Sequence, residues 1–263
     1  MTKYCLKDKE ANLLEKTPDD MHHRMAKEFA RIEKKYKSTL TSEEIYSYLK
    51  GFQYIVPQGS PMYGLGNDYV NASLSNCVVV DMPDDNISSI IDAGKDLANL
   101  FKRRCGVGID VSKLRPEGAP VNNSAGTTTG AWSFADFYSY ICRMIGQNGR
   151  RGALMISMDI RHPDIERFIT MKQDLTKVTG ANVSVRISDD FMEAVENDED
   201  FALRYPINGG TTPAFTKTVK ARELWSLIIE SATTTAEPGL LMWGNILKRL
   251  PANEYAEHGF KTL

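Results

Sequence analysis

Residues 74–111, LSNCVVVDMPDDNISSIIDAGKDLANLFKRRCGVGIDV, decide the fold class because they contain the pattern of a strand, a helix and a second strand in succession. Residues 74–80 form a short apolar run rich in β-branched side chains, which is typical of a buried strand. Apolar residues then recur with helical spacing over 87–103, and 107–111 has the pattern of another strand. Strands joined by helical crossovers pair in parallel, so this stretch predicts an α/β layer fold.

The alternation of strands and helices continues towards the C-terminus. The predicted strands are 153–160 and 181–187, and the predicted helices are 133–147, 163–172, 189–196 with Ser188 as its N-cap, and 221–250 with an interruption near Glu237-Pro238-Gly239. Residues 118–130 are rich in Gly, Thr, Asn and Pro and predict a loop. The acid-rich residues 189–200 predict a solvated helix face and a turn rather than a metal site.

The N-terminal segment has a helical pattern of its own. Residues 17–20, Thr-Pro-Asp-Asp, combine an N-cap, a proline at the first helical position and acids in the first turn. One apolar stripe follows at spacings of three and four, formed by Met21, Met25, Phe29, Ile32 and Tyr36. A second short helix is predicted after Ser42, and the Gly- and Pro-rich residues 51–66 predict a loop. We therefore expect a helical region over 1–65 and an α/β domain over 66–263.

The composition is that of an ordinary globular chain. Of the 263 residues, 42% are hydrophobic and 25% charged, and the formal net charge is -2. These values argue against wholesale disorder and against a strongly basic protein that coats DNA. The sequence contains no apolar run of about 18 residues and no secretory h-region at its N-terminus, so we expect a cytoplasmic protein without a membrane span.

The four cysteines, Cys5, Cys77, Cys105 and Cys142, form no C-x-x-C pair. A structural zinc site is therefore not expected, and we predict no metal site in the chain. Cys77 stands at the start of the strand predicted over 74–80 and follows small polar residues. Two interpretations stay open for it, an accessible redox thiol and a buried core cysteine.

Three further stretches carry polar chemistry. Gly106-Val107-Gly108 with Arg115 can accommodate a phosphate, but the dinucleotide fingerprint lacks its third glycine and a P-loop is absent. Residues 146–153, GQNGRRGA, form a cationic loop that fits either a nucleotide or a plain surface turn. His162 precedes a proline at a helix start, so the pattern favours a capping or packing residue over a catalytic base.

These stretches, taken in order, resemble the large (catalytic) subunit of ribonucleotide reductase. The phrases that carry the resemblance are LSNCVVVDMPDDNISSI, GVGIDVSKLRPEGAPV, GQNGRRGALMISMDIRHPDIERFI and NVSVRISDDFMEAV. The resemblance extends from Tyr4 to about Asn245 and is closest to the shorter bacterial and phage enzymes, including adenosylcobalamin-dependent ones. It implies the N-terminal half of a ten-stranded α/β barrel, preceded by a small helical region.

The resemblance also implies roles for individual residues. Cys77 matches the strand cysteine that supplies reducing equivalents and becomes half of a disulfide in each turnover. The positions that match the substrate site are Ser60, Asn76, Cys77, Gly106, Gln147 and Arg151, with Arg150 as the alternative to Arg151. The positions that match the specificity effector site are Asp84 or Asp85, Arg115, Val121 and Asn122, where Asn122 replaces a basic residue of the family. Residues 147–153 match the loop that couples effector to substrate choice.

The family motif Asn-x-Cys-x-Glu, with the radical cysteine and its glutamate base, does not occur in this sequence, and neither does the second redox cysteine. We therefore expect an N-terminal fragment of a split large subunit that is inactive until a C-terminal chain completes it. The alternative is a non-catalytic module that binds effector nucleotides and dimerises.

The resemblance implies the partners of the completed enzyme. They are a ribonucleoside di- or triphosphate substrate, a deoxynucleoside triphosphate or ATP effector, a reductant of the thioredoxin or glutaredoxin type, and a second copy in a homodimer. No cofactor is expected within this chain. The radical source lies elsewhere, in a dimetal partner subunit or in adenosylcobalamin.

Overall fold

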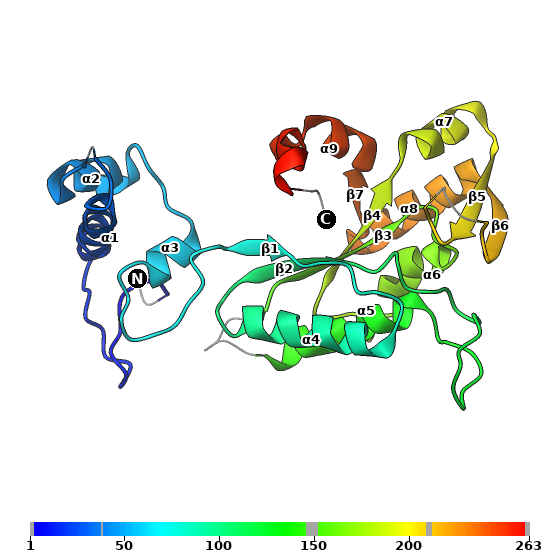
Figure 1. Cartoon of the computed structure of the whole chain (residues 1–263), viewed down its shortest axis with the longest axis horizontal. Helices are drawn as coiled ribbons and strands as arrows, with labels where there is room; N and C mark the ends of the chain where they lie inside the picture. Colours follow the sequence, from blue (N-terminus) through cyan, green and yellow to red (C-terminus); the bar gives the residue numbers. More distant parts are fainter. Residues whose placement is uncertain (1–2, 38, 146–151, 209–211, 261–263) are drawn as a thin grey trace. The chain divides into compact units, whose positions relative to one another are not determined.

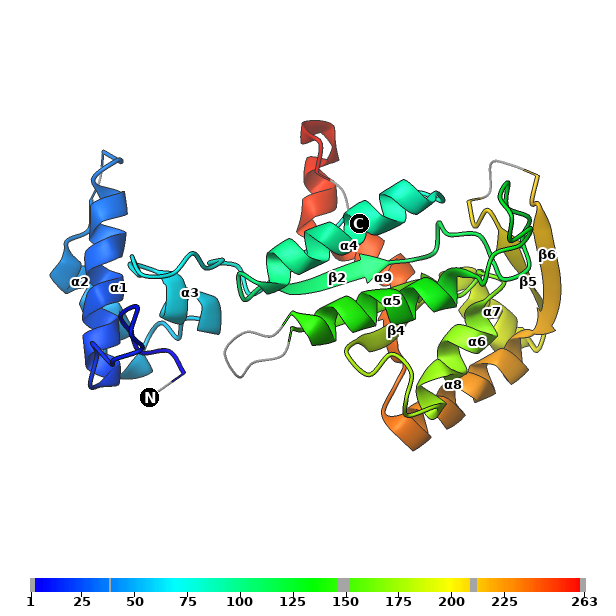
Figure 2. The same ribbon diagram turned by 90° about the horizontal axis from the view of Figure 1, so that it is seen from below.

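The computed structural model describes residues 3–37, 39–145, 152–208 and 212–260, and the chain forms two compact units (Figures 1 and 2). The N-terminal unit comprises the residues up to Val78 together with Lys102–Gly106, and the second unit comprises Val79–Phe101 and the residues from Val107 onward. The boundary expected at residue 65 stays a prediction.

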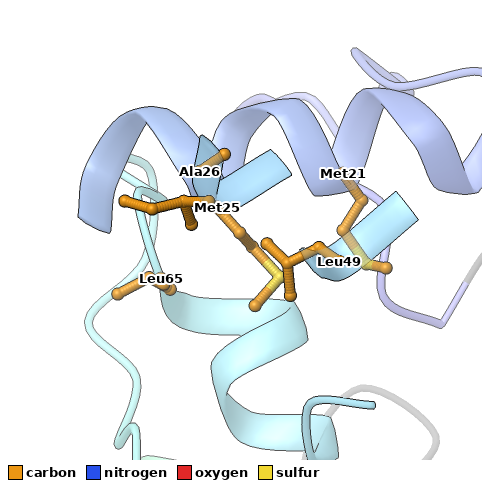
Figure 3. Packing of buried hydrophobic residues seen from close by; sticks show 6 residues of the cluster. Met21, Met25, Ala26, Leu49 and Leu65 are labelled. Carbon is orange, nitrogen blue, oxygen red and sulfur yellow. The ribbon is translucent and has the colours of Figure 1, made fainter. Parts of the chain in front are cut away.

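The N-terminal unit is built around two capped helices. Helix α1 (Pro18–Glu33) begins as the sequence predicts, because the Thr17 hydroxyl accepts from the Asp20 N–H and the Asp20 carboxylate accepts from the Thr17 N–H. Helix α2 (Ser42–Leu49) has the same capping box. Their facing sides bury an apolar cluster, of which Figure 3 labels Met21, Met25, Ala26, Leu49 and Leu65.

Two short helices lie in the stretch that the sequence predicts as loop. Residues Lys50–Phe52 form a 3-10 turn and Gly59–Gly64 form helix α3, so the expectation of a loop throughout 51–66 is wrong. Proline and glycine suppress the helical signal in a sequence, yet Pro61 lies in the first turn of α3, where no intrahelical N–H donor is needed. The turn places Ser60 in a buried position.

A five-stranded sheet forms the centre of the α/β fold. The strands are β1 (Cys77–Val79), β2 (Gly106–Asp110), β3 (Leu154–Asp159), β4 (Asn182–Ile187) and β7 (Gly239–Met242), in the order β1-β2-β3-β4-β7. The pairs β2–β3, β3–β4 and β4–β7 are parallel. The predicted α/β class with parallel strands is therefore confirmed. Among the described residues the sheet does not close into a barrel, and the half-barrel stays a prediction.

Helices flank this sheet. In order along the chain they are α4 (Ile87–Phe101), α5 (Ala131–Met144), α6 (Ile165–Thr170), α7 (Asp189–Asn197), α8 (Ala221–Thr235) and α9 (Trp243–Arg249). Figure 1 shows α4 and α5 along one side of the strands and α9 on the other. The apolar face of the strands is the one that faces α4 and α5. Its side chains are all buried: Ile109, Ile156, Met158, Val183, Val185 and Ile187.

The opposite face of the sheet is polar, which is unusual for parallel strands, whose residues are commonly apolar on both faces. It carries Asp110, Ser157, Asp159, Ser184 and Arg186, all less than 9% exposed. Arg186 Nη2 lies 3.1 Å from Asp159 Oδ2, and Arg186 Nε lies 3.4 Å from Asp110 Oδ2. These ion pairs connect β2, β3 and β4 across the sheet.

An antiparallel hairpin and the edge strand β7 are absent from the sequence prediction. Strands β5 (Asp200–Tyr205) and β6 (Phe215–Lys220) pair in register from Asp200 with Lys220 to Tyr205 with Phe215. The exposed side chains of β6 give no apolar alternation, and β7 is too short for a period to appear.

Within the described residues, no helix has the length and apolar character needed to cross a membrane.

Candidate functional site

Cys77 differs from the other cysteines in exposure. Its side chain is exposed, whereas Cys5, Cys105 and Cys142 are buried. Of the two interpretations that the sequence leaves open, the buried core cysteine is therefore wrong for Cys77. An exposed thiol at the start of a strand is sterically available to a ligand or to another thiol.

Hydrogen bonds hold the residues around Cys77 in one frame. The Ser60 N–H donates to Asn76 Oδ1 at 2.9 Å, and the Gly106 N–H donates to the Asn76 carbonyl at 2.6 Å. The Asn76 side-chain amide also donates to the Gln58 side chain. Ser60, Asn76 and Gly106 thus lie together next to Cys77, all within the N-terminal unit. Their binding of substrate stays a prediction.

The hydroxyl of Ser60 is an unpaired donor in this frame. The residue is 3% exposed, and its hydroxyl has no hydrogen-bond partner among the described residues. An unpaired buried hydroxyl costs about 1–3 kcal/mol, which a ligand oxygen that accepts its hydrogen would offset. The arrangement suits an oxygen-rich ligand.

Cys105 lies close to this frame but has the character of a structural thiol. It is 2% exposed, and its Sγ lies 3.3 Å from the Gly106 carbonyl oxygen. Burial raises the pKa of the Cys105 thiol, with a smaller opposing effect from the Ser73 hydroxyl. A protonated, buried thiol is a poor nucleophile.

We expect iodoacetamide to alkylate Cys77 in the folded protein at least about tenfold faster than the other three cysteines, because access and thiolate formation govern the rate. Burial also raises the pKa of Cys142 to about 11. Peptide mass mapping after timed quenching measures the alkylation rate of each cysteine separately. Labelling in denaturant gives the rate of each thiol when it is fully accessible. Equal rates at Cys77 and Cys105 in the folded state would contradict the exposure difference.

The second unit gathers the residues predicted for the effector site. Arg115 Nε donates to Asp85 Oδ2 at 2.7 Å, and the Arg115 N–H donates to Asp85 Oδ1 at 3.1 Å. Arg115 Nη1 donates to the Pro120 carbonyl at 2.7 Å, next to Val121. Lys113 Nζ lies 3.3 Å from Asp84 Oδ1. Two acidic and two basic side chains thus form a half-exposed cluster.

Val121 and Asn122 lie in a hairpin-like loop that extends from this cluster. The Val121 N–H donates to the Gly126 carbonyl at 3.0 Å, and the Thr128 N–H donates to the Ala119 carbonyl at 2.9 Å. Asn122 is exposed. The structure therefore brings Asp84, Asp85, Arg115 and the 118–128 loop together, while effector binding by them stays a prediction.

His162 is a packing residue, as its sequence position favours. It is fully buried, its Nε2 lies 2.8 Å from the Leu114 carbonyl oxygen, and its Nδ1 accepts from the Asp164 N–H at 3.0 Å. These two contacts define a neutral ring with the hydrogen on Nε2. The ring fixes the carbonyl that directly precedes Arg115.

Asp164 anchors the other end of the same loop. Its carboxylate accepts from the Glu117 N–H at 3.0 Å and from the Ala131 N–H, the first residue of α5, at 2.9 Å. Gly130 has φ of +90°, and a Cβ there would lie 2.5 Å from Asp164 Oδ2, so the close approach requires glycine. The carboxylate thereby joins the start of the 118–128 loop to the start of α5.

Acid is expected to destabilise the second unit through His162. Burial lowers the pKa of His162, against the opposing pull of the Asp164, Asp110 and Asp159 carboxylates. The unfolded chain then binds a proton below about pH 6.5 that the folded chain does not, so stability is full above that pH and falls by up to about 1.4 kcal/mol per pH unit below it.

Urea unfolding of the wild type and of His162→Gln between pH 5 and 8 measures this effect. Burial also lowers the pKa of His22 in the N-terminal unit, so both proteins retain that contribution and only their difference reports on His162. A smaller pH dependence in His162→Gln is expected. Identical slopes in the two proteins would contradict the assignment.

Two residues of the cluster around Asp85 and Arg115 are not predicted from the sequence. Lys113 lies two positions before Arg115 on the same loop, and this proximity was a usable signal. Tyr205 comes from the end of β5, and its hydroxyl reaches Asp85 Oδ2 at 3.0 Å and the Lys113 carbonyl at 2.9 Å. No local pattern connects positions so far apart in the sequence. Gln147, Arg150 and Arg151 lie outside the described residues.

Comparison with known proteins points to one family. Residues 75–255 match the barrel domain of ribonucleotide reductase. The chain is similar to the vitamin B12-dependent ribonucleoside-diphosphate reductase of Thermoplasma acidophilum, with 33% identity over 217 residues that cover 82% of this chain and 27% of that protein. The Mycobacterium tuberculosis enzyme of the same name is 29% identical over 254 residues, covering 95% of this chain and 35% of its own length.

The similarity extends to reductases that are not named for vitamin B12. The ribonucleoside-diphosphate reductase large subunit of Dictyostelium discoideum is 30% identical over 193 residues, which cover 64% of this chain and 22% of that subunit. The chain thus spans between 22% and 35% of the length of these three relatives.

Proposed function

The chain belongs to the ribonucleotide reductase family, whose barrel domain matches residues 75–255, and on this premise we propose that it supplies the first part of a reductase catalytic barrel. The completed enzyme would replace the 2′ hydroxyl of a ribonucleotide by hydrogen. In that reaction the hydroxyl leaves as water while two thiols become one disulfide, so one nucleotide consumes two reducing electrons.

The observation that carries this proposal is the exposed thiol of Cys77 beside the Ser60–Asn76–Gly106 frame. One of the two thiols is then Cys77. The free hydroxyl of Ser60 and the backbone of the frame are suited to bind oxygens of the nucleotide. Gln147 and Arg151 are proposed to act with them from the loop that links effector to substrate.

The second thiol, the radical cysteine and its glutamate base are proposed to come from strands that extend this sheet. Strand β7 is an edge strand, and Leu240 and Met242 on it are each 39% exposed. Leu247 on the neighbouring helix α9 is 45% exposed. An edge strand with exposed apolar side chains is a template for further pairing. We propose that a separate chain provides these strands and that activity requires it.

The radical source is proposed to be adenosylcobalamin, since the relatives from T. acidophilum and M. tuberculosis are named vitamin B12-dependent. A dimetal partner subunit is the other source. Among the described residues no group of three His, Cys, Asp or Glu side chains is arranged to hold a metal ion, and we assign no residue of this chain to the radical cofactor. Reduction of the disulfide is proposed to use a thioredoxin or glutaredoxin.

We propose that Asp84, Asp85, Arg115 and the loop around Val121 and Asn122 bind a deoxynucleoside triphosphate or ATP. Arg115 offers a planar cation suited to a phosphate. Exposed apolar side chains on two neighbouring helices support a dimer face there: Ile87 and Ile91 on α4, and Tyr140 and Met144 on α5.

A second candidate function is a module that only binds effector and dimerises. It is favoured by one observation, namely that the whole effector cluster lies within the second unit. Such a module would bind nucleotides without any completing chain.

The test is affinity purification of the tagged chain from its native host, followed by peptide sequencing and a reductase assay of the complex. The proposed function predicts a co-purifying polypeptide with an Asn-x-Cys-x-Glu motif and formation of deoxyribonucleotide by the pair. Nucleotide binding by the chain, with no such polypeptide in the host proteome, would support the module instead.

A further inference from the structure

Tyr205 connects the β5–β6 hairpin to two segments that are distant in sequence. Its hydroxyl lies 3.0 Å from Asp85 Oδ2 and 2.9 Å from the Lys113 carbonyl oxygen. A phenol has one hydrogen to donate, so the two acceptors share it. Tyr205 therefore contacts both the Asp85 carboxylate and the Lys113 main-chain carbonyl of the effector cluster.

Asp85 is the point at which Tyr205 and Arg115 meet. The same carboxylate oxygen, Oδ2, accepts from Arg115 Nε at 2.7 Å and from the Tyr205 hydroxyl. When the Arg115 guanidinium turns to a phosphate, Asp85 loses this ion pair but keeps the tyrosine hydroxyl on Oδ2 and the Arg115 backbone N–H on Oδ1. Tyr205 thus lowers the cost of releasing Arg115 to a ligand, because the partly buried Asp85 carboxylate, 26% exposed, keeps a side-chain donor on the oxygen that the guanidinium leaves.

Tyr205 also completes the support of the backbone before Arg115. The Lys113 carbonyl is held by Tyr205, and the next carbonyl, that of Leu114, is held by His162. The rings of Tyr205 and His162 pack edge to face with centroids 6.0 Å apart. Two adjacent carbonyls fixed by two packed rings leave the following residue, Arg115, little freedom of direction.

The hydroxyl of Tyr205 is a neutral donor throughout the physiological range. Burial raises the pKa of Tyr205, and the negative charge of Asp85 raises it further. Because the neutral Tyr205 hydroxyl carries no negative charge, it does not draw the Arg115 guanidinium away from Asp85.

We propose that Tyr205 is a positioning residue of the effector site and that the β5–β6 hairpin is the element that responds to nucleotide binding there. The inference rests on the proposed function, in which the Arg115 cluster binds a nucleoside triphosphate. It adds a residue and a structural element to that function. The hairpin responds to the nucleotide because the Tyr205 hydroxyl shifts its hydrogen bond between the Asp85 carboxylate and the Lys113 carbonyl as Arg115 moves.

Calorimetric titration of the whole chain tests the first half of the proposal. The ligands are dATP, dGTP, dTTP and ATP, each with magnesium, and the proteins are the wild type, Tyr205→Phe, Tyr255→Phe and Arg115→Ala. Tyr205→Phe is expected to bind the preferred nucleotide about 10- to 150-fold more weakly, as for loss of one hydrogen bond to a charged acceptor. Tyr255→Phe removes a hydroxyl from an exposed side chain and is expected to stay within about twofold of the wild type.

Hydrogen exchange tests the second half and separates positioning from folding. In the wild type, the amides of 200–205 and 215–220 are expected to exchange more slowly when nucleotide is bound. In Tyr205→Phe this added protection is expected to disappear, while exchange without nucleotide and the thermal midpoint stay close to those of the wild type. Faster exchange without nucleotide, together with a lower midpoint, would assign Tyr205 to folding alone and overturn the proposal.

The titrations distinguish failure of this inference from failure of the effector site. If the wild type binds none of the four nucleotides, the proposed effector site is wrong and the role of Tyr205 falls with it. If the wild type binds, Arg115→Ala does not, and Tyr205→Phe binds like the wild type, the effector site stands and the Tyr205 inference is wrong.

Discussion

Cys77→Ser is expected to lower ribonucleotide reduction by the completed enzyme by at least about a thousandfold when a thioredoxin-type protein is the reductant. A serine hydroxyl has nearly the size of the thiol but cannot form a disulfide, so the two electrons for the 2′ carbon have no donor. The exposed position of Cys77 leaves the core unchanged by this substitution. Fold and nucleotide binding should therefore persist.

The assay measures deoxyribonucleotide formed per minute by the complex of this chain with the chain that completes it. Cys105→Ala is the matched control, because it also removes a sulfur from the N-terminal unit but from a buried site. The control is expected to stay within about threefold of the wild type, as for a small change in the core. Retention of a tenth or more of the activity by Cys77→Ser would remove the redox role from Cys77.

Arg186→Met is expected to destabilise the second unit by about 3–5 kcal/mol. The guanidinium lies between Asp159 and Asp110 on the polar face of the sheet and stacks 4.5 Å from the ring centre of Trp243. Methionine fills part of the space of the aliphatic stem, but it leaves two carboxylates without their shared counter-ion. Among the described residues, the remaining donors to Asp110 are the Ser157 hydroxyl and the Ser112 backbone N–H, which do not supply a charge.

Urea unfolding at pH 7 measures this loss, and two further variants locate its cause. Arg161→Met removes a more exposed cation that pairs with Asp159 and Asp190, and should cost no more than about 1 kcal/mol. Adding Asp110→Asn and Asp159→Asn to Arg186→Met removes the two negative charges that Arg186 faced and should recover part of the stability. A loss below about 1 kcal/mol in Arg186→Met alone would mean that the ion pairs do not support the sheet.

Local chemistry explains what the sequence predicts correctly. The start of α1 follows from Thr17 and Asp20, since a capping box is complete within four residues. The parallel sheet follows from residues 74–111, where the change from a strand pattern to a helical one and back occurs within one segment. The neighbours of His162 define a helix start, and this position favours a capping or packing role for the ring.

The elements that the sequence does not reveal depend on contacts made elsewhere. Helix α3 is hidden by its own glycines and proline, and β7 is a strand because β4 lies beside it. Tyr205 is the clearest case in the site, since nothing near it indicates that its hydroxyl meets Asp85. Exposure also required the structure, because the pattern around Cys77 fits a buried strand residue equally well.

The central claim is that Cys77 is a redox thiol of a ribonucleotide reductase, and a single-turnover experiment tests it most directly. The completed enzyme is reduced, freed of reductant, mixed with ribonucleotide, effector and the radical source, then quenched with an alkylating agent and digested. Mass spectrometry is predicted to find one disulfide between Cys77 and a cysteine of the completing chain for each deoxyribonucleotide formed. Product formation with Cys77 recovered as the alkylated thiol would contradict the claim.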